Sequence, residues 1–146
     1  MAWCSSAEGQ RFADIVREVT DAIKEQGPFD PALFELQLGA AERTAESERL
    51  RWLMSKAAPL IAKGDVYGRK WDEEHVAPIL NAVLEREYHQ NLIYLALKEG
   101  LASVRDISKR TGLDLLRISQ LLSELEKASQ VVFKGHQNRA PQFEAA

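Results

Sequence analysis

Apolar residues recur every three or four positions along most of this chain, which is the spacing of amphipathic helices. The first such run is predicted to form one helix, with Ser5 as its N-cap residue and Glu8 completing a capping box. Gly27-Pro28 would end this helix, because glycine suits a helix C-terminus and proline cannot continue the helix. We expect its apolar side to be a docking or core face, made of Phe12, Ile15, Val16, Val19 and Ile23.

A second helical pattern is predicted from residue 32 to residue 58, with Pro59 kinking or ending the helix. The middle of this pattern, residues 40–51, is heavily charged, so we expect it to face solvent. The turn-rich residues 63–69 then mark the predicted boundary with the rest of the chain.

A third helical pattern begins near Asp72, which is placed to cap it, with Trp71 and Val76 as a hydrophobic staple. Pro78 leaves the exact start open, because proline is comfortable only in the first turn of a helix. The apolar spacing continues until Gly100, which is predicted to end the helix.

The last part of the chain predicts two helices joined by a tight turn. Val104 and Ile107 belong to a short helix, and Gly112 supplies a turn residue that tolerates positive φ. Asp114 is placed to cap the longer helix that follows. The apolar face of that helix consists of Leu115, Ile118, Leu121, Leu122 and Leu125.

Two short β-strands are predicted after these helices, at residues 131–133 and 142–143, separated by a polar run with Gly135 and Asn138. The whole segment from Val104 to Phe143 resembles the winged helix-turn-helix superfamily. This resemblance implies a fold, and it leaves the function open.

The predicted fold class is therefore mainly α, with N-terminal helices followed by a winged helix-turn-helix domain that carries a small β-wing. We predict three segments: a tail helix in residues 1–28, a helical linker region in residues 29–70, and the winged helix-turn-helix domain in residues 71–146.

The N-terminal block carries a second resemblance. A tryptophan, a serine, a Glu-Gly pair and a phenylalanine precede an amphipathic helix that ends in Gly-Pro. This arrangement resembles the C-terminal end of the delta subunit of methyl-viologen-reducing hydrogenase, also called the hydrogenase iron–sulfur subunit. The matching positions lie within residues 3–28 and are Trp3, Ser5, Glu8, Gly9, Phe12 and Gly27-Pro28.

This second resemblance implies the tail of an electron-relay subunit, extended by a winged-helix domain. Such subunits pass electrons to heterodisulfide-reductase-like subunits in anaerobes, so the implied partners are flavin- and iron–sulfur-containing oxidoreductase subunits. The cluster-binding cysteines of that family precede the matching phrase, and Cys4 stands where an apolar residue is expected. No ligand role is therefore carried over to Cys4.

The composition narrows the possible functions. The single cysteine cannot provide an internal disulfide or a complete iron–sulfur site, so we expect no cofactor in this chain. No apolar run approaches the roughly 20 residues of a membrane span, and no signal peptide is visible, so we expect a cytoplasmic protein. No nucleophile motif, phosphate loop or metal-ligand spacing is present, and we expect no stand-alone catalysis.

A DNA-binding role is the alternative interpretation. Arg117 and Gln120 are the side chains that could read base edges from the longer helix. The candidates for phosphate contacts are Arg105, Lys109 and Arg110 in the shorter helix, and Lys134 and Arg139 in the wing.

The charge balance weighs against that alternative. The formal net charge of the chain is −3. The exposed side of the longer helix is expected to include the acids Asp114 and Glu124 beside Arg117. Two hypotheses remain: a non-catalytic docking component of an electron-transfer complex, which we favour, and a DNA-binding transcriptional regulator.

Overall fold

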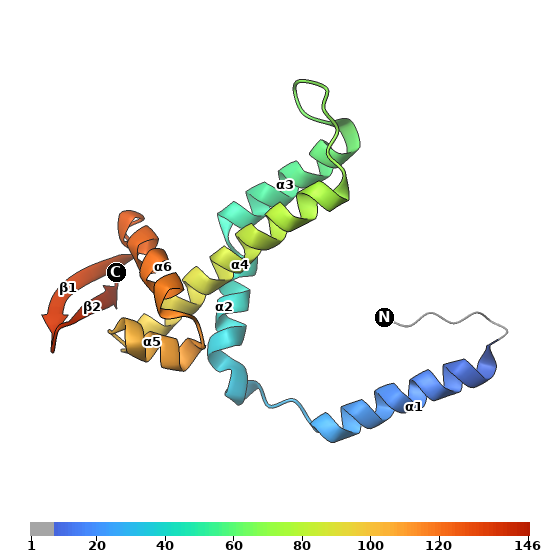
Figure 1. Ribbon diagram of the computed structural model, residues 1–146, viewed down its shortest axis with the longest axis horizontal. Coiled ribbons are helices and arrows are strands. Elements are labelled where there is room, and N and C mark those ends of the chain that lie inside the picture. Colours follow the sequence, from blue (N-terminus) through green and yellow to red (C-terminus); the bar gives the residue numbers. More distant parts are fainter. Residues whose placement is uncertain (1–7) are drawn as a thin grey trace. The chain divides into compact units, whose positions relative to one another are not determined.

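The computed structural model describes residues 8–146 and is mainly helical, with a small antiparallel sheet at its C-terminal end (Figure 1). These residues divide into two compact units, one ending at Leu33 and the other spanning Phe34–Ala146. The elements are α1 (Gly9–Gln26), the 3-10 turn η1 (Pro31–Phe34), α2 (Glu35–Ala45), α3 (Glu48–Lys63), α4 (Glu73–Lys98), α5 (Val104–Thr111), α6 (Leu115–Lys127), β1 (Val131–Gln137) and β2 (Ala140–Ala145).

Helix α1 confirms the predicted end of the first helix. Gly27 follows it with φ of 70°, and the Gly27 N–H donates to the carbonyl oxygen of Ile23. A positive φ favours glycine, which explains why the helix stops before the proline. The predicted cap at Ser5 lies outside the described residues, and the helix that the structure describes begins at Gly9.

The prediction of one helix over residues 32–58 is wrong, because the chain forms two helices there. Ser47 adopts an extended conformation, and its hydroxyl accepts a hydrogen bond from the Leu50 N–H at 3.1 Å. This cap starts α3 as a new helix. Helix α3 then continues through Pro59 as far as Lys63, so Pro59 does not end it.

The charged stretch at residues 40–51 does not face solvent throughout, which is a second correction. Ala40 and Thr44 are buried in α2, which packs against α4. The Thr44 hydroxyl donates to the Ala40 carbonyl oxygen and accepts from the Asn91 amide at 2.9 Å. Because the charged residues of this stretch dominate the sequence pattern, the pattern did not predict the buried side of the same helix.

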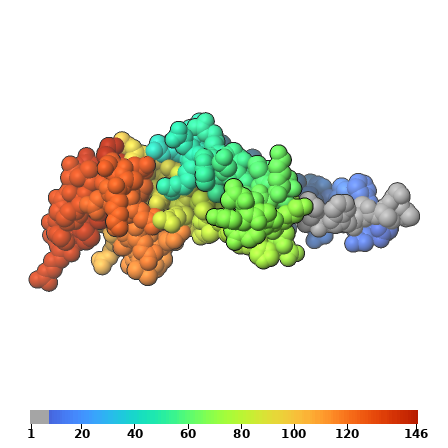
Figure 2. All heavy atoms as spheres, turned by 90° about the horizontal axis from the view of Figure 1, so that it is seen from above, coloured from blue at the N-terminus to red at the C-terminus, as the bar shows by residue number. Residues whose placement is uncertain are grey.

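Helix α4 runs through the whole unit Phe34–Ala146. The Asp72 carboxylate caps it by accepting from the His75 N–H at 2.9 Å, as predicted, and Pro78 lies inside the helix. Helix α3 runs alongside the first half of α4, and the second half lies among α5, α6 and β2 (Figure 1). In Figure 2, the loop between α3 and α4 (green) lies away from the β-hairpin (red) within this unit.

The C-terminal part confirms the predicted short helix, turn, longer helix and hairpin. Gly112 ends α5 with φ of 75°, and the Asp114 carboxylate accepts from two N–H groups at the start of α6. Asn138 and Arg139 both have positive φ, as a tight two-residue hairpin turn requires. The core of this part consists of Ile93, Ala96, Leu97, Ile107, Ile118, Leu121, Leu122, Leu125 and Val131.

Candidate protein-docking and nucleic-acid surfaces

The apolar face of α1 is exposed in the structure. Phe12, Val16, Val19 and Ile23 leave 57%, 45%, 52% and 61% of their surface accessible, and Ile15 is half-buried. Their spacing of four, three and four residues places them on one side of the helix. No residue of α1 is buried. The predicted docking face is therefore a continuous apolar stripe that nothing else in its own unit, over the described residues 8–33, covers.

The positions that flank this stripe carry no charge. Ala13 and Thr20 lie beside it on one edge, and Ile15 and Ala22 lie beside it on the other. The Thr20 hydroxyl donates to the Val16 carbonyl oxygen at 2.7 Å, so this polar group is satisfied within the helix. The uncharged face is therefore wider than a narrow two-helix seam and suits a partner surface that contacts the helix on both sides.

The charges of α1 lie away from the stripe and largely pair with one another. Arg17 donates to Asp14 at 2.9 Å, and Lys24 lies 4.0 Å from Asp21. These pairs are solvent-exposed, so each contributes little to stability. Their consequence is that the outer side of α1 carries charges of both signs and no basic cluster.

The outer face of α6 begins with leucines. The buried core residues define the inner side of α6. The opposite, outer side consists of residues spaced by four, three and four positions, which are Leu116, Gln120, Ser123 and Lys127. Leu116 is 67% exposed, and the adjacent Leu115 is 49% exposed. Leu115 therefore does not belong to the buried face, where the apolar spacing had placed it. Sequence reasoning missed this exposed leucine pair because both residues continue the apolar pattern of the helix.

The two residues predicted to read base edges differ in their exposure and in the side of α6 that they occupy. Gln120 is exposed on the outer face of α6. Arg117 is half-buried on a flank of the helix, where its charge contributes to the lowered pKa of His89 on α4. Burial is the main cause of that lowered pKa, and Glu85 opposes it. Arg117 therefore does not share the exposed outer face with Gln120.

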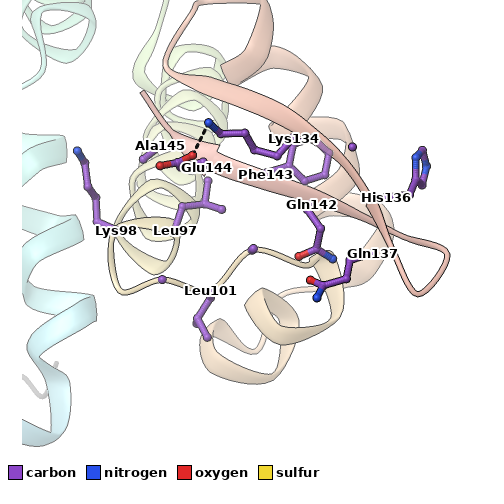
Figure 3. A pocket seen from close by; sticks show the side chains of 13 residues that line it. Leu97, Lys98, Leu101, Lys134, His136, Gln137, Gln142, Phe143, Glu144 and Ala145 are labelled. Carbon is purple, nitrogen blue, oxygen red and sulfur yellow. Dashed lines mark ion pairs between the residues drawn. The ribbon is translucent and has the colours of Figure 1, made fainter.

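Two of the predicted phosphate-binding cations are held in ion pairs. Arg110 forms two hydrogen bonds to Glu99, at 2.9 and 3.1 Å, and they raise the pKa of Arg110 above its ordinary value. Lys134 of β1 lies 2.6 Å from Glu144 of β2, and this contact lowers the pKa of Glu144 (Figure 3). Arg105, Lys109 and Arg139 are exposed, and no ion pair involving them is found among residues 8–146.

The acids Asp114 and Glu124 also accept hydrogen bonds within the protein, and the expectation that Glu124 lies on the exposed side of α6 is wrong. Glu124 does not belong to the outer face of α6, because it accepts hydrogen bonds from Arg86 and Gln90 of α4 at 3.0 and 2.9 Å. Asp114 accepts from the Leu116 and Arg117 N–H groups as the cap of α6. The outer face is therefore less acidic than the sequence suggested, and also less basic.

A cavity of about 660 Å³ lies between the β-hairpin and the end of α4 (Figure 3). Its charged side chains include Lys98 and the paired Lys134 and Glu144. Lys98 also lies 5.5 Å from the ring centre of Tyr94. Within residues 8–146, no group of three or more His, Cys, Asp or Glu side chains is arranged to hold a metal ion.

Comparisons with protein-family models, curated proteins and solved structures find no match for this chain. In the part of the chain that the structure describes, no helix is both long enough and apolar enough to cross a membrane.

Proposed function

We propose that this protein is a non-catalytic docking component of a cytoplasmic electron-transfer complex of the hydrogenase and heterodisulfide-reductase type. Its partners would be flavin- and iron–sulfur-containing oxidoreductase subunits. The observation that carries the proposal is the exposed, uncharged face of α1, which coincides with the segment that resembles the tail of the hydrogenase delta subunit. Of that phrase, Glu8, Gly9, Phe12 and Gly27-Pro28 lie within the described residues, and Trp3 and Ser5 lie outside them.

We assign the C-terminal part to the winged helix-turn-helix fold. The bridge between Ser103 and Gln142 supports this assignment, because it adds a third short extended segment beside β2. The Phe143 N–H also donates to the Ala102 carbonyl oxygen at 2.9 Å. In this proposal the domain contacts protein, since the exposed start of α6 presents Leu115 and Leu116 and not cations.

Val19→Asp tests the docking role of α1. An aspartate in the middle of an apolar interface loses the burial of a valine, worth about 1.5 kcal/mol or more, and leaves a carboxylate without a partner. We expect the variant to fail to co-purify flavin- and iron–sulfur-containing subunits when the tagged full-length chain is expressed in its native host. Arg17→Asp is the matched control, because it adds the same side chain to the charged side of α1.

The control should retain the partners, and both variants should keep the melting temperature of the wild type, since α1 has no buried residue. If Val19→Asp co-purified the same subunits as the wild type, the face of α1 would not be the docking surface. If the wild-type chain co-purified no such subunits, the proposed complex itself would be wrong.

DNA binding is the second candidate function, and one observation favours it. Asp114 and Glu124 are engaged in a helix cap and in contacts with α4, so they do not oppose a phosphate backbone as strongly as their number suggests. Arg105, Lys109 and Arg139 are exposed and could contact phosphates. Against this candidate, Arg110 and Lys134 are paired with carboxylates.

Fluorescence anisotropy with random and gene-proximal duplexes at two salt concentrations separates the two functions. We expect weak binding, in the non-specific range of about 10⁻⁴ to 10⁻⁶ M, that falls with salt and is unchanged by Arg117→Ala. Lys109→Ala is the comparison, because losing one phosphate contact would reduce the salt dependence by about one unit on a log–log plot. Sub-micromolar, sequence-selective binding that Arg117→Ala abolishes would make the protein a transcriptional regulator instead.

A further inference from the structure

A groove of about 720 Å³ lies between the start of α5, the start of α6 and the tip of the β-hairpin. We name it the wing groove, and its lining includes Val104, Arg105, Asp106, Leu115, Arg139 and Pro141. The bridge between Ser103 and Gln142, which also line the groove, joins α5 to β2. A cavity of this size holds a small ligand or a few side chains of a partner.

Two cations of the wing groove have no carboxylate partner among residues 8–146. Arg105 lies in the first turn of α5 and Arg139 at the tip of the hairpin, and both are exposed. Asp106 is the acid that lines the groove, and its carboxylate accepts from the Ser103 hydroxyl at 2.6 Å. Two cations and one anion give the lining a formal charge of +1. The two guanidinium groups are therefore available to an external carboxylate, whose geometry they match.

The hairpin turn forms without any contribution from the side chain of Arg139. Asn138 and Arg139 have φ of 51° and 63°. A two-residue turn of this kind favours Asn-Gly, because glycine adopts positive φ without strain. The arginine therefore adds a charge at the edge of the wing groove, and Arg139→Gly removes that charge without weakening the turn.

The apolar part of the lining distinguishes between a protein and a DNA ligand. Leu115 is 49% exposed, and Val104 and Pro141 line the groove with it. A phosphate backbone leaves such a leucine without an apolar neighbour, whereas a peptide brings carboxylates and an apolar side chain to the same place. A formal charge of +1 is also small for a surface that neutralises several phosphates. These observations favour a protein segment.

We propose that the wing groove binds a short acidic segment of a partner protein, in which Asp or Glu side chains flank one large apolar side chain. The carboxylates pair with Arg105 and Arg139, and the apolar side chain covers Leu115. We base this on the protein-contacting role proposed above for the C-terminal domain. The wing groove and the face of α1 share no residue, so the two surfaces can be tested separately.

Selection of random peptides of about a dozen residues, displayed on phage, against the immobilised full-length chain is the first measurement. We expect the enriched peptides to carry acidic residues on both sides of a Leu, Ile or Phe. Enriched peptides are then labelled with fluorescein, and fluorescence anisotropy gives their Kd. Replacing their Asp and Glu by Asn and Gln should raise the Kd more than about 10-fold, since the amides carry no charge.

Two variants remove the cations of the wing groove one at a time. Arg105→Ala and Arg139→Gly should each raise the Kd of the acidic peptides about 10-fold. Lys127→Ala is the matched control, because it removes an exposed cation from the last turn of α6, outside the groove. Its Kd should stay within about 2-fold of the wild type. The Tm of Arg139→Gly should be at or above that of the wild type, so its loss of binding is not a loss of folding.

The proposal would be overturned by enriched peptides without acidic residues. It would also be overturned by a Kd that neither arginine variant changes, or that Lys127→Ala raises equally. Peptides that lose binding on Val19→Asp and keep it on Arg139→Gly would belong to the face of α1. A DNA duplex that binds more tightly than the peptides and is weakened by both arginine variants would make the groove a phosphate-binding surface.

These results separate this inference from the proposed complex. If the acidic peptides bound as expected but the tagged chain co-purified no oxidoreductase subunits, the proposed complex would be wrong and the ligand class of the wing groove would stand. If the subunits co-purified but no acidic peptide were enriched, the docking role of α1 would stand and the wing groove would have no such ligand.

Discussion

The two halves of α4 belong to one uninterrupted helix, and their surroundings differ. In residues 73–88 only Val76 is buried, whereas Leu92, Ile93, Ala96 and Leu97 are buried in the last part. Helix α4 contacts α2, α3, α5, α6 and β2. Helix α3 runs alongside its first half, and α5, α6 and β2 surround the second (Figure 1). Continuous helical periodicity in the sequence therefore does not imply a continuous core.

The difference shows where the stability of this unit resides and where its surface remains available. The core residues of the second half are closed in by neighbouring elements on several sides. The first half and α3 leave Met54, Ile79 and Leu84 exposed. Apolar side chains at helical spacing stabilise the chain where several elements enclose them, and they are available to partners where only one neighbour is present.

Removing a core side chain from the enclosed half tests this comparison with the largest expected effect. Ile118 is fully buried at the centre of the cluster, so Ile118→Ala should reduce the free energy of unfolding by about 2–5 kcal/mol. Leu53→Ala in α3 should cost less than about 1.5 kcal/mol, because the side chain is only half-buried. Urea unfolding followed by circular dichroism measures both values.

Equal losses for the two variants would contradict the comparison, since α3 and the first half of α4 would then be as tightly enclosed as the core. Ile118→Val is a suitable intermediate control. It should cost about 0.5–1.5 kcal/mol, because it removes a single methylene from the same position.

The enclosed part was also the part that the sequence predicted best. Gly112 and Asp114 lie two positions apart along the chain, and they define the turn and the cap without help from distant residues. The contact of Glu124 with Arg86 joins residues 38 positions apart. Such a contact depends on how α4 and α6 pack, and no local spacing predicts it.

The errors at residues 32–58 have a local and a non-local cause. Ser47 stands between Glu46 and Glu48 in a charged run, where its role as a cap is hard to distinguish from a surface serine. The burial of Thr44 depends on Asn91 of α4, which the sequence pattern does not relate to it. The exposed face of α1 was predicted as an apolar stripe, but its partner cannot follow from the periodicity of a single helix.

Removing the N-cap residue of α6 or that of α4 should change the free energy of unfolding less than Ile118→Ala does. Asp114→Ala should cost about 0.5–2 kcal/mol of unfolding free energy, since two N–H groups of α6 lose their acceptor beside the core. Asp72→Ala should mainly fray the first turn of α4, because only Val76 is buried in this half of the helix. Urea unfolding gives the global values, and amide hydrogen exchange at His75 and Val76 reports the local fraying.

Asp114→Asn is the control, because its amide oxygen can still accept from the same N–H groups and should restore most of the loss. A global loss for Asp72→Ala as large as that for Asp114→Ala would mean that the start of α4 unfolds together with the core. The division between the two halves of the helix would then not hold.

The smallest effect concerns His89, which lies where the two halves of α4 meet. Its buried Nδ1 atom has no hydrogen-bond partner among the described residues, and the nearest Glu85 oxygen is 3.9 Å away. Burial lowers the pKa of His89 below its ordinary value of 6.5, with a further contribution from Arg117. The unfolded chain therefore binds a proton more readily than the folded chain as the pH falls below about 6.5. This contribution to stability is complete above that pH and is lost as the pH falls through the lower folded pKa.

His89→Gln removes the titrating group and keeps a polar side chain of similar size. We expect the urea midpoint of the wild type to fall between about pH 7 and pH 5, and the fall to be smaller in the variant. The lowered carboxylate pKa values of Asp65, Asp72 and Glu144 act below this range, since they start from ordinary values of 3.8 to 4.5. An identical pH dependence in both proteins would show that His89 titrates normally. In that case the junction between the two halves of α4 would be open to solvent, and the enclosed region would begin only at Leu92.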